Sequence, residues 1–409
     1  MRKGFVPLMV TQFVSALADN ALLLVAMALL MAQGQAAFWI PWLKLMFTLS
    51  YVVLGPWVGV WADNWPKQFV MMVANSVKAV ACLGMLLGVD PLLAFALVGV
   101  GAAAYAPAKY GLVTELAKPE ELVSANAWIE ISTVSAVLLG VVLGGALVST
   151  TWLDWTASMG IQSLALPNST FSASLIALLC MYGLAALLNS WIPGSGKSYE
   201  RVDWAWSSVW KACWQDQRTL WRDPLGGVSL SVTTLFWGVG ATLQLIVLAW
   251  AQQQLQLNLS QAAYLQAATA VGVVVGAALA AKTVSLHKAT SVLGMGIALG
   301  LLLPLMLWVT EWQTAALLTA AIGVVGGFFV VPMNALLQHR GVTLLSAGRS
   351  IAVQNVNENT SILLMMAGYS LMIYVQAELS VLVTVFSVAV TLGMSTVVWR
   401  YRRLGSPRL

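Results

Sequence analysis

The sequence predicts an all-α membrane protein with twelve transmembrane helices in two pseudo-symmetric six-helix halves. Three observations predict it: the composition, the number of long apolar stretches and an internal repeat. Of the 409 residues, 60% are hydrophobic and only 9% are charged, whereas soluble domains carry roughly 25% charged residues. We therefore expect most of the chain to lie in lipid.

Twelve apolar stretches are long enough to cross a bilayer, which takes about 20 residues. They are separated by glycine, proline and charge clusters, and lie near 5–31, 38–62, 68–88, 91–112, 122–149, 170–192, 226–251, 260–282, 287–309, 313–338, 346–375 and 379–400. The long connection after the sixth span predicts three parts. These are a first half (1–192), a cytoplasmic linker (193–225) and a second half (226–409).

The first stretch follows the basic start MRK, as the apolar core of a signal peptide does. It is too long for a signal peptide and is interrupted by Asp19, so we expect a retained first helix. An intramembrane carboxylate is costly and indicates a functional residue.

Positive charges fall on one side of this topology. With the N-terminus in the cytoplasm, eighteen of the 20 lysines and arginines lie in cytoplasmic segments, and none lies in an outer loop. The other two, Lys44 and Lys78, lie inside spans. This is the positive-inside pattern, which predicts that both termini are cytoplasmic. The net charge of +5 is thereby explained without a nucleic-acid partner.

The linker contains a tryptophan stripe, in the stretch VDWAWSSVWKACWQDQRTLWRD. Its four members share one helical face flanked by basic residues, and are Trp206, Trp210, Trp214 and Trp221. The pattern predicts an amphipathic helix in the cytoplasmic membrane interface. Docking of a partner is the alternative reading.

The halves align at an offset of 225 residues. VGVGAAAYAPAKYG (98–111) aligns with GVVGGFFVVPMNAL (323–336), and after a three-residue slip Glu130 aligns with Glu358. Asp19 aligns with Gln244 in the seventh span. This duplicated architecture resembles the major facilitator superfamily, in which the first and seventh helices face a central cavity. The resemblance therefore implies that Asp19 faces a polar cavity.

The connection GVWADNWPKQ between the second and third spans resembles the loop motif of the major facilitator superfamily. Gly59, Ala62, Asp63 and Lys67 match its glycine, small residue, aspartate and distal base. Asp63 is expected to cap a following helix, or to pair with a base as a cytoplasmic latch.

Several blocks together resemble the bacterial lysophospholipid transporter family over essentially the whole chain. They are QFVSALADNALLL, VGVGAAAYAPAKYG, TTLFWGVGATLQ, GGFFVVPMNALLQHRG and AVQNVNENT. The resemblance implies an inner-membrane flippase that moves lysophospholipids, chiefly lysophosphatidylethanolamine, from the outer to the inner leaflet. It also implies functional coupling to an acyltransferase/acyl carrier protein synthetase that re-acylates them.

This sequence departs from the family at two positions. The family usually has an arginine where Gln244 stands, and a neutral residue where Lys44 stands. The cation that would face Asp19 from the seventh helix is therefore absent, and the candidates to replace it are Lys44 and Lys78.

Polar residues inside spans are the candidate substrate-binding residues: Asp19, Asn20, Lys44, Lys78, Gln244, Asn355 and Glu358. Asp19 would bind a headgroup ammonium or act as a gating charge, and its alternative is a structural bond between helices. Asn20 points about 100° away from Asp19 on an ideal helix, which leaves a helix-packing role open. The alternative for Lys44 is a side chain that extends toward the membrane interface.

Charged residues near the cytoplasmic face are the candidate gating residues: Asp63, Lys67, Lys109, Glu130 and Arg349. Glu130 and Glu358 share a position in the repeat and are expected to pair with Lys109 and Arg349, or to cap neighbouring helices.

Other chemistry is not expected. His287 and His339 begin no His-x4-Asp pattern, no phosphate-binding glycine loop is present, and Cys82, Cys180 and Cys213 lack zinc or disulfide spacing. We expect no metal, no cofactor and no enzyme. Two rival functions remain: a proton-coupled exporter of amphipathic drugs, and a non-transporting membrane partner of the acyltransferase.

Overall fold

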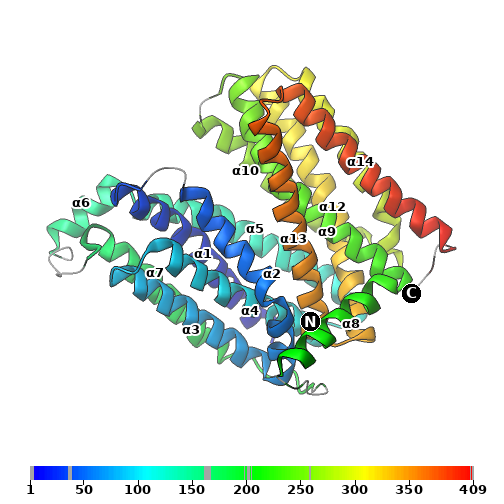
Figure 1. Cartoon of the computed structure of the whole chain (residues 1–409), viewed down its shortest axis with the longest axis horizontal. Helices are drawn as coiled ribbons and strands as arrows, with labels where there is room; N and C mark the ends of the chain where they lie inside the picture. The colour runs from blue at the N-terminus through cyan, green and yellow to red at the C-terminus, as the bar shows by residue number, and fades with distance from the viewer. Residues whose placement is uncertain are drawn as a thin grey trace. The chain divides into compact units, whose positions relative to one another are not determined.

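The computed structural model describes residues 4–35, 39–160, 167–197, 199, 203, 205–257, 259–405 and 407, which are helical throughout apart from turns and connections (Figure 1). The α-helices are α1 (Phe5–Ala32), α2 (Ile40–Asn64), α3 (Lys67–Leu86), α4 (Pro91–Leu116), α5 (Leu122–Leu147), α6 (Thr150–Ser158), α7 (Ser172–Asn189), α8 (Trp206–Arg222), α9 (Pro224–Gln253), α10 (Leu259–Thr283), α11 (Leu293–Leu302), α12 (Trp312–Leu344), α13 (Ala347–Tyr374) and α14 (Leu379–Arg403). The 3₁₀ turns are η2 (Pro119–Glu121), η4 (Ser169–Phe171), η5 (Leu286–Val292) and η6 (Leu303–Trp308). Four basic residues used to predict the orientation lie outside the described residues: Arg2, Lys3, Arg201 and Arg408.

The chain forms two compact units. Unit 1 contains residues 1–116, 135–213 and 346–353, and unit 2 contains residues 117–134, 214–345 and 354–409. The first residues of α5 thus belong to unit 2, and the first residues of α13 belong to unit 1. The division predicted from the sequence, at 192 and 225, stays a prediction.

Eleven helical stretches of the described chain are long and apolar enough to cross a membrane. Each matches one predicted span; the ninth, 286–308, is η5, α11 and η6 in succession. The remaining predicted span, 346–375, is the continuous helix α13, whose polar run QNVNENTS lowers its hydropathy. The protein is a multi-pass membrane protein, and the count of twelve spans stays a prediction.

The core of unit 1 is built by α1, α3, α4 and α7. α3 lies beside both α4 and α7, and α1 packs on α7 (Figure 1). Ala18, Leu22 and Val25 of α1 are fully buried against Leu175 and Leu178 of α7. This packing places the polar residues of α1 beside those of α3 and α7.

The tightest helix pair of unit 2 is α10 with α12. Gly272 and Gly276 face the α12 backbone at Ala320 and Val324, and a methyl group at either glycine would collide with a carbonyl oxygen. The mirror contact uses Gly323 and Gly327 of α12 against α10. Small residues let membrane helices approach this closely, so these four glycines allow the close packing of α10 on α12.

Two helices lie outside the spans. α6 falls in the connection after the fifth span, which the sequence did not predict to be helical, and Ser149 caps its start by accepting a hydrogen bond from the Trp152 N–H. α8 confirms the helix predicted in the linker. Its Trp206 packs on Trp57 of α2 in unit 1. Trp221 donates to Asn357 in unit 2, so it does not share the exposure of the rest of the stripe.

Candidate functional site

Asp19 lies in the middle of α1 and is neutralised by Lys78 of α3. The Lys78 ammonium donates to Asp19 Oδ2 at 2.6 Å. Tyr182 of α7 donates its hydroxyl to the other oxygen, Oδ1, at 2.8 Å. The partner of Asp19, which the sequence left open between Lys44 and Lys78, is therefore Lys78.

The Lys78 side chain is enclosed by protein. Its ammonium also donates to Ser15 Oγ at 3.1 Å, and it lies 5.2 Å from the centre of the Tyr105 ring. The exposed fraction of its side chain is 2%, against 17% for Asp19. Asp19 is therefore the member of the pair that a molecule outside unit 1 can reach.

Two polar atoms beside this pair have no hydrogen-bond partner among the described residues. They are Asn75 Nδ2 and Tyr105 Oη, both buried. Asn75 already accepts from Ser15 Oγ through its carbonyl oxygen at 2.7 Å. Because unpaired buried donors are rare in folded proteins, these two donors indicate a place where a further acceptor can bind.

Three other predicted substrate-binding residues lie on α1, α2 and α9. Asn20 donates to the Ala16 carbonyl of its own helix at 2.8 Å, and its predicted packing bond to another helix stays a prediction. Lys44 is exposed on α2. Gln244 is exposed on α9 of unit 2, and its backbone carbonyl oxygen accepts from Gln266 Nε2 at 3.2 Å.

Unit 2 has its own buried polar cluster, where α12 meets α13. Gln354 Nε2 donates to Asn334 Oδ1 at 3.0 Å and to Glu358 Oε1 at 2.7 Å. Asn355 and Glu358 are both 7% exposed. The repeat had aligned Asn334 with Lys109, but the sequence did not indicate that Asn334 would join the cluster.

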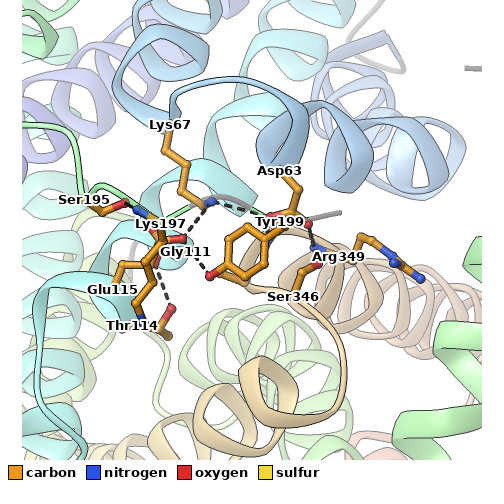
Figure 2. A network of polar contacts seen from close by, with 12 residues as sticks. Asp63, Lys67, Gly111, Thr114, Glu115, Ser195, Lys197, Tyr199, Ser346 and Arg349 are labelled. Atoms are coloured by element: carbon orange, nitrogen blue, oxygen red, sulfur yellow. Dashed lines mark hydrogen bonds and ion pairs between the residues drawn. The ribbon is translucent and has the colours of Figure 1, made fainter. Parts of the chain in front are cut away.

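Asp63 caps the start of α13. Its carboxylate accepts from the backbone N–H of Gly348 at 2.8 Å and of Arg349 at 3.0 Å, and from the Ser346 hydroxyl (Figure 2). Lys67, one turn further along the chain, lies 3.5 Å from Asp63 Oδ1. Asp63 thus pairs with the predicted base, but the helix that it caps is remote in sequence and is not the following helix α3.

Two residues that the sequence did not indicate complete this latch, which we define as Asp63, Lys67, Glu115, Tyr199 and residues 346–349. Lys67 Nζ lies 2.9 Å from Glu115 Oε1, and Tyr199 donates its hydroxyl to the same oxygen at 2.9 Å (Figure 2). The Lys67 ammonium stands 4.7 Å above the centre of the Tyr199 ring. Burial and the neighbouring Glu115 carboxylate raise the pKa of the Tyr199 phenol.

The remaining predicted gating residues have these positions. Lys109 is buried, donates to Gln12 Oε1 at 3.5 Å and lies over the Tyr110 ring. Glu130 is buried, at 6% exposure, in the part of α5 that belongs to unit 2. Arg349 contributes its backbone N–H to the latch.

Comparison with known proteins agrees with this architecture. The model of the Major Facilitator Superfamily matches residues 8–356. The Lysophospholipid transporter LplT of Salmonella gallinarum is 40% identical over 374 residues, which are 91% of this chain and 89% of that protein. The protein of the same name from Escherichia coli is 39% identical over the same shares.

Solved structures show the fold. A bacterial homologue of the iron transporter ferroportin has a TM-score of 0.70 at 17% identity, covering 98% of this chain and 100% of that one. The Major Facilitator Superfamily transporter FucP has a TM-score of 0.71 at 13% identity, covering 97% and 98%. At such identities the likeness concerns the fold alone.

Proposed function

The chain belongs to the lysophospholipid transporter family within the major facilitator superfamily, and we propose that it moves lysophospholipids, chiefly lysophosphatidylethanolamine, from the outer to the inner leaflet of a bacterial inner membrane. The observation that carries the proposal is the 40% identity over 91% of the chain to curated lysophospholipid transporters. The resemblance drawn from the sequence blocks is thereby confirmed.

The charge pair of unit 1 suits such a substrate. Lysophosphatidylethanolamine is a zwitterion that carries an ammonium and a phosphate on one headgroup. The partly exposed Asp19 carboxylate supplies a partner for the ammonium, and Lys78 with Asn75 supplies donors for the phosphate. We assign substrate contacts also to Asn20, Lys44, Gln244, Asn355 and Glu358.

Transport would proceed by alternating exposure of a central cavity to the two leaflets. Twelve spans with both termini in the cytoplasm would put the latch on the cytoplasmic side, and the one-sided distribution of lysines and arginines supports this orientation. Asp63, Lys67, Lys109, Glu130 and Arg349 would then act as gating residues. Opening the latch would free the start of α13 from Asp63.

Re-acylation would be carried out by a separate acyltransferase/acyl carrier protein synthetase on the cytoplasmic side. This chain would act as the transporter and not as an enzyme, with no cofactor of its own. Trp206 and Trp214 of α8 are 68% and 73% exposed, which suits contact with the membrane interface.

The test uses the purified full-length protein in liposomes, with no partner present. We expect it to move lysophosphatidylethanolamine between leaflets, and we expect Asp19→Ala to abolish this without loss of folded protein. Asp154→Ala, in an exposed position of α6, is the matched control. Wild-type protein that moves no lysophospholipid would overturn the proposal, and normal transport by Asp19→Ala would overturn the site.

The same preparation separates the rival functions. Transport that collapses when a proton gradient is dissipated would favour a proton-coupled exporter of amphipathic drugs. A non-transporting partner of the acyltransferase would show no translocation in liposomes at all.

A further inference from the structure

The charges at the centre of unit 1 are balanced without any ligand. Asp19 and Lys78 lie 2.6 Å apart, and their immediate partners Ser15 and Tyr182 are neutral. The pair has no equivalent in unit 2, because the repeat aligns Asp19 with Gln244 and Lys78 with Leu303. The empty site therefore carries no net charge.

This balance matters for a protein that must change conformation while empty. A lone carboxylate or a lone ammonium at the depth of Asp19 or Lys78 carries a large desolvation penalty. In a carrier with such a charge, the conformational change that returns the empty site to the first leaflet would be slow. The carrier would then work only as an exchanger, moving one substrate molecule in each direction. A carrier with an internal ion pair does not meet this barrier.

The geometry lets a substrate replace Lys78 at Asp19. The stem of Lys78 packs against Gly101, where a methyl group would lie 2.7 Å from Lys78 Cγ, so the lysine stays beside the site when its ammonium moves. Asn75 Nδ2 and Tyr105 Oη, which have no partner among the described residues, lie on the lysine's own helix α3 and on the adjacent helix α4. They are available to an incoming phosphate oxygen.

We propose that Lys78 is a built-in substitute for the substrate ammonium, which neutralises Asp19 in the empty carrier and so permits net movement of lysophospholipid instead of obligatory exchange. The inference rests on the proposed function and deepens it, since it describes the state of the Asp19–Lys78 pair while no substrate is bound. Lys78 acts here as a positioning residue for the empty state, in addition to its contact with phosphate.

The experiment compares two rates in proteoliposomes of the full-length protein. Net flipping is measured by albumin extraction of a fluorescent lysophosphatidylethanolamine that starts in one leaflet only. Exchange is measured with the same probe after unlabelled lysophosphatidylethanolamine has been placed in both leaflets. The readout is the ratio of the net rate to the exchange rate, which a general loss of folding or of affinity does not change.

For Lys78→Gln we expect both rates to fall, with the net rate falling at least about tenfold more than the exchange rate, because Asp19 is then uncompensated in the empty carrier. Lys78→Arg keeps the ion pair and should keep the wild-type ratio. The double variant Asp19→Asn with Lys78→Gln removes both charges and should restore the ratio. Asp19→Asn alone, unlike Asp19→Ala, keeps an acceptor oxygen for the substrate ammonium and so a measurable rate. It leaves Lys78 uncompensated and should lower the ratio, which provides a second test if Lys78→Gln does not fold.

An unchanged ratio in Lys78→Gln, or in Asp19→Asn, would overturn the inference and leave the pair with a structural role only. A lowered ratio that the double variant does not restore would overturn it as well. These outcomes differ from a failure of the proposed function, in which wild-type protein moves the probe in neither assay.

Discussion

The Asp63 carboxylate holds the backbone of Gly348, which lies 285 residues further along the chain, through a 2.8 Å hydrogen bond. A side chain normally caps the helix that directly follows it. Here an aspartate from α2 does so for α13, and its negative charge also faces the positive end of the helix dipole. The start of α13 is thereby fixed within unit 1.

Asp63→Ala should lower the free energy of unfolding of the purified protein by about 1–2 kcal/mol, because the helix cap and the hydrogen-bond partner of Ser346 are lost together. Asp63→Asn keeps an acceptor oxygen and should lose less. The midpoint of thermal unfolding in detergent measures this. Asp154→Ala, at an exposed position, should stay within about 0.5 kcal/mol, and equal midpoints for the two alanine variants would contradict the capping role.

Tyr199 supports the latch through its hydroxyl. In Tyr199→Phe the ring stays under Lys67, but Glu115 loses a donor while its other oxygen, Oε2, already lacks a partner among the described residues. We expect a loss of about 1–2 kcal/mol. Tyr264→Phe, where the tyrosine is exposed, is the control, and an equal effect there would argue against a role for the Tyr199 hydroxyl.

The Tyr199 contribution should also depend on pH. Because burial and Glu115 raise the pKa of the Tyr199 phenol, the stability that it provides is fully present below the pKa of unfolded tyrosine, about 10. It is lost as pH rises toward the higher pKa of the folded state. Unfolding midpoints at increasing alkaline pH should bring wild type and Tyr199→Phe together. A difference that stays constant would contradict this assignment.

A second charge pair fixes the start of α9 in unit 2. Arg340 donates to both oxygens of Asp223, at 2.6 and 3.0 Å, and the Gly226 N–H donates to Oδ2 at 2.7 Å. Burial opposes the charge on Asp223, but these hydrogen bonds outweigh it and hold the pKa of its carboxyl below its usual range.

Asp223→Asn should therefore cost about 1–3 kcal/mol near neutral pH. The loss should shrink as pH falls below about 4, the usual pKa of an aspartate, because the wild-type carboxylate is then progressively protonated. Glu311→Gln is the matched control, since Glu311 precedes α12 without a side-chain cap. Unfolding followed from neutral to acidic pH measures both variants, and a loss independent of pH would contradict the role of the charge.

The helices could be predicted from the sequence because a bilayer imposes a minimum apolar length on each span. The polar residue at the centre of the first span could be found for the same reason, as an exception to that pattern. α13 shows the limit of this signal, since a helix whose polar face is covered by protein need not be apolar all round.

The partners of these residues could not be predicted. Whether Asp19 meets Lys44 or Lys78 depends on which faces of α1, α2 and α3 turn toward one another, and the sequence pattern does not show this. Tyr182 and Tyr199 carried no signal, because a tyrosine in or after an apolar span is also common at membrane interfaces. The cap from Asp63 to Gly348 needed the tertiary structure.

The glycines that join α10 to α12 provide a prediction with a closely matched control. Gly276→Ala would place a methyl group on the Val324 carbonyl oxygen, so the two helices must separate, at a cost of about 1–3 kcal/mol. Gly240→Ala, in α9, meets nothing within 4 Å and should be neutral or slightly stabilising, because alanine favours a helix over glycine. Thermal unfolding of the two variants decides the point, since the same substitution is made in two helices of the same unit. If Gly276→Ala unfolds at the same temperature as Gly240→Ala, the close approach of α10 and α12 does not contribute to stability.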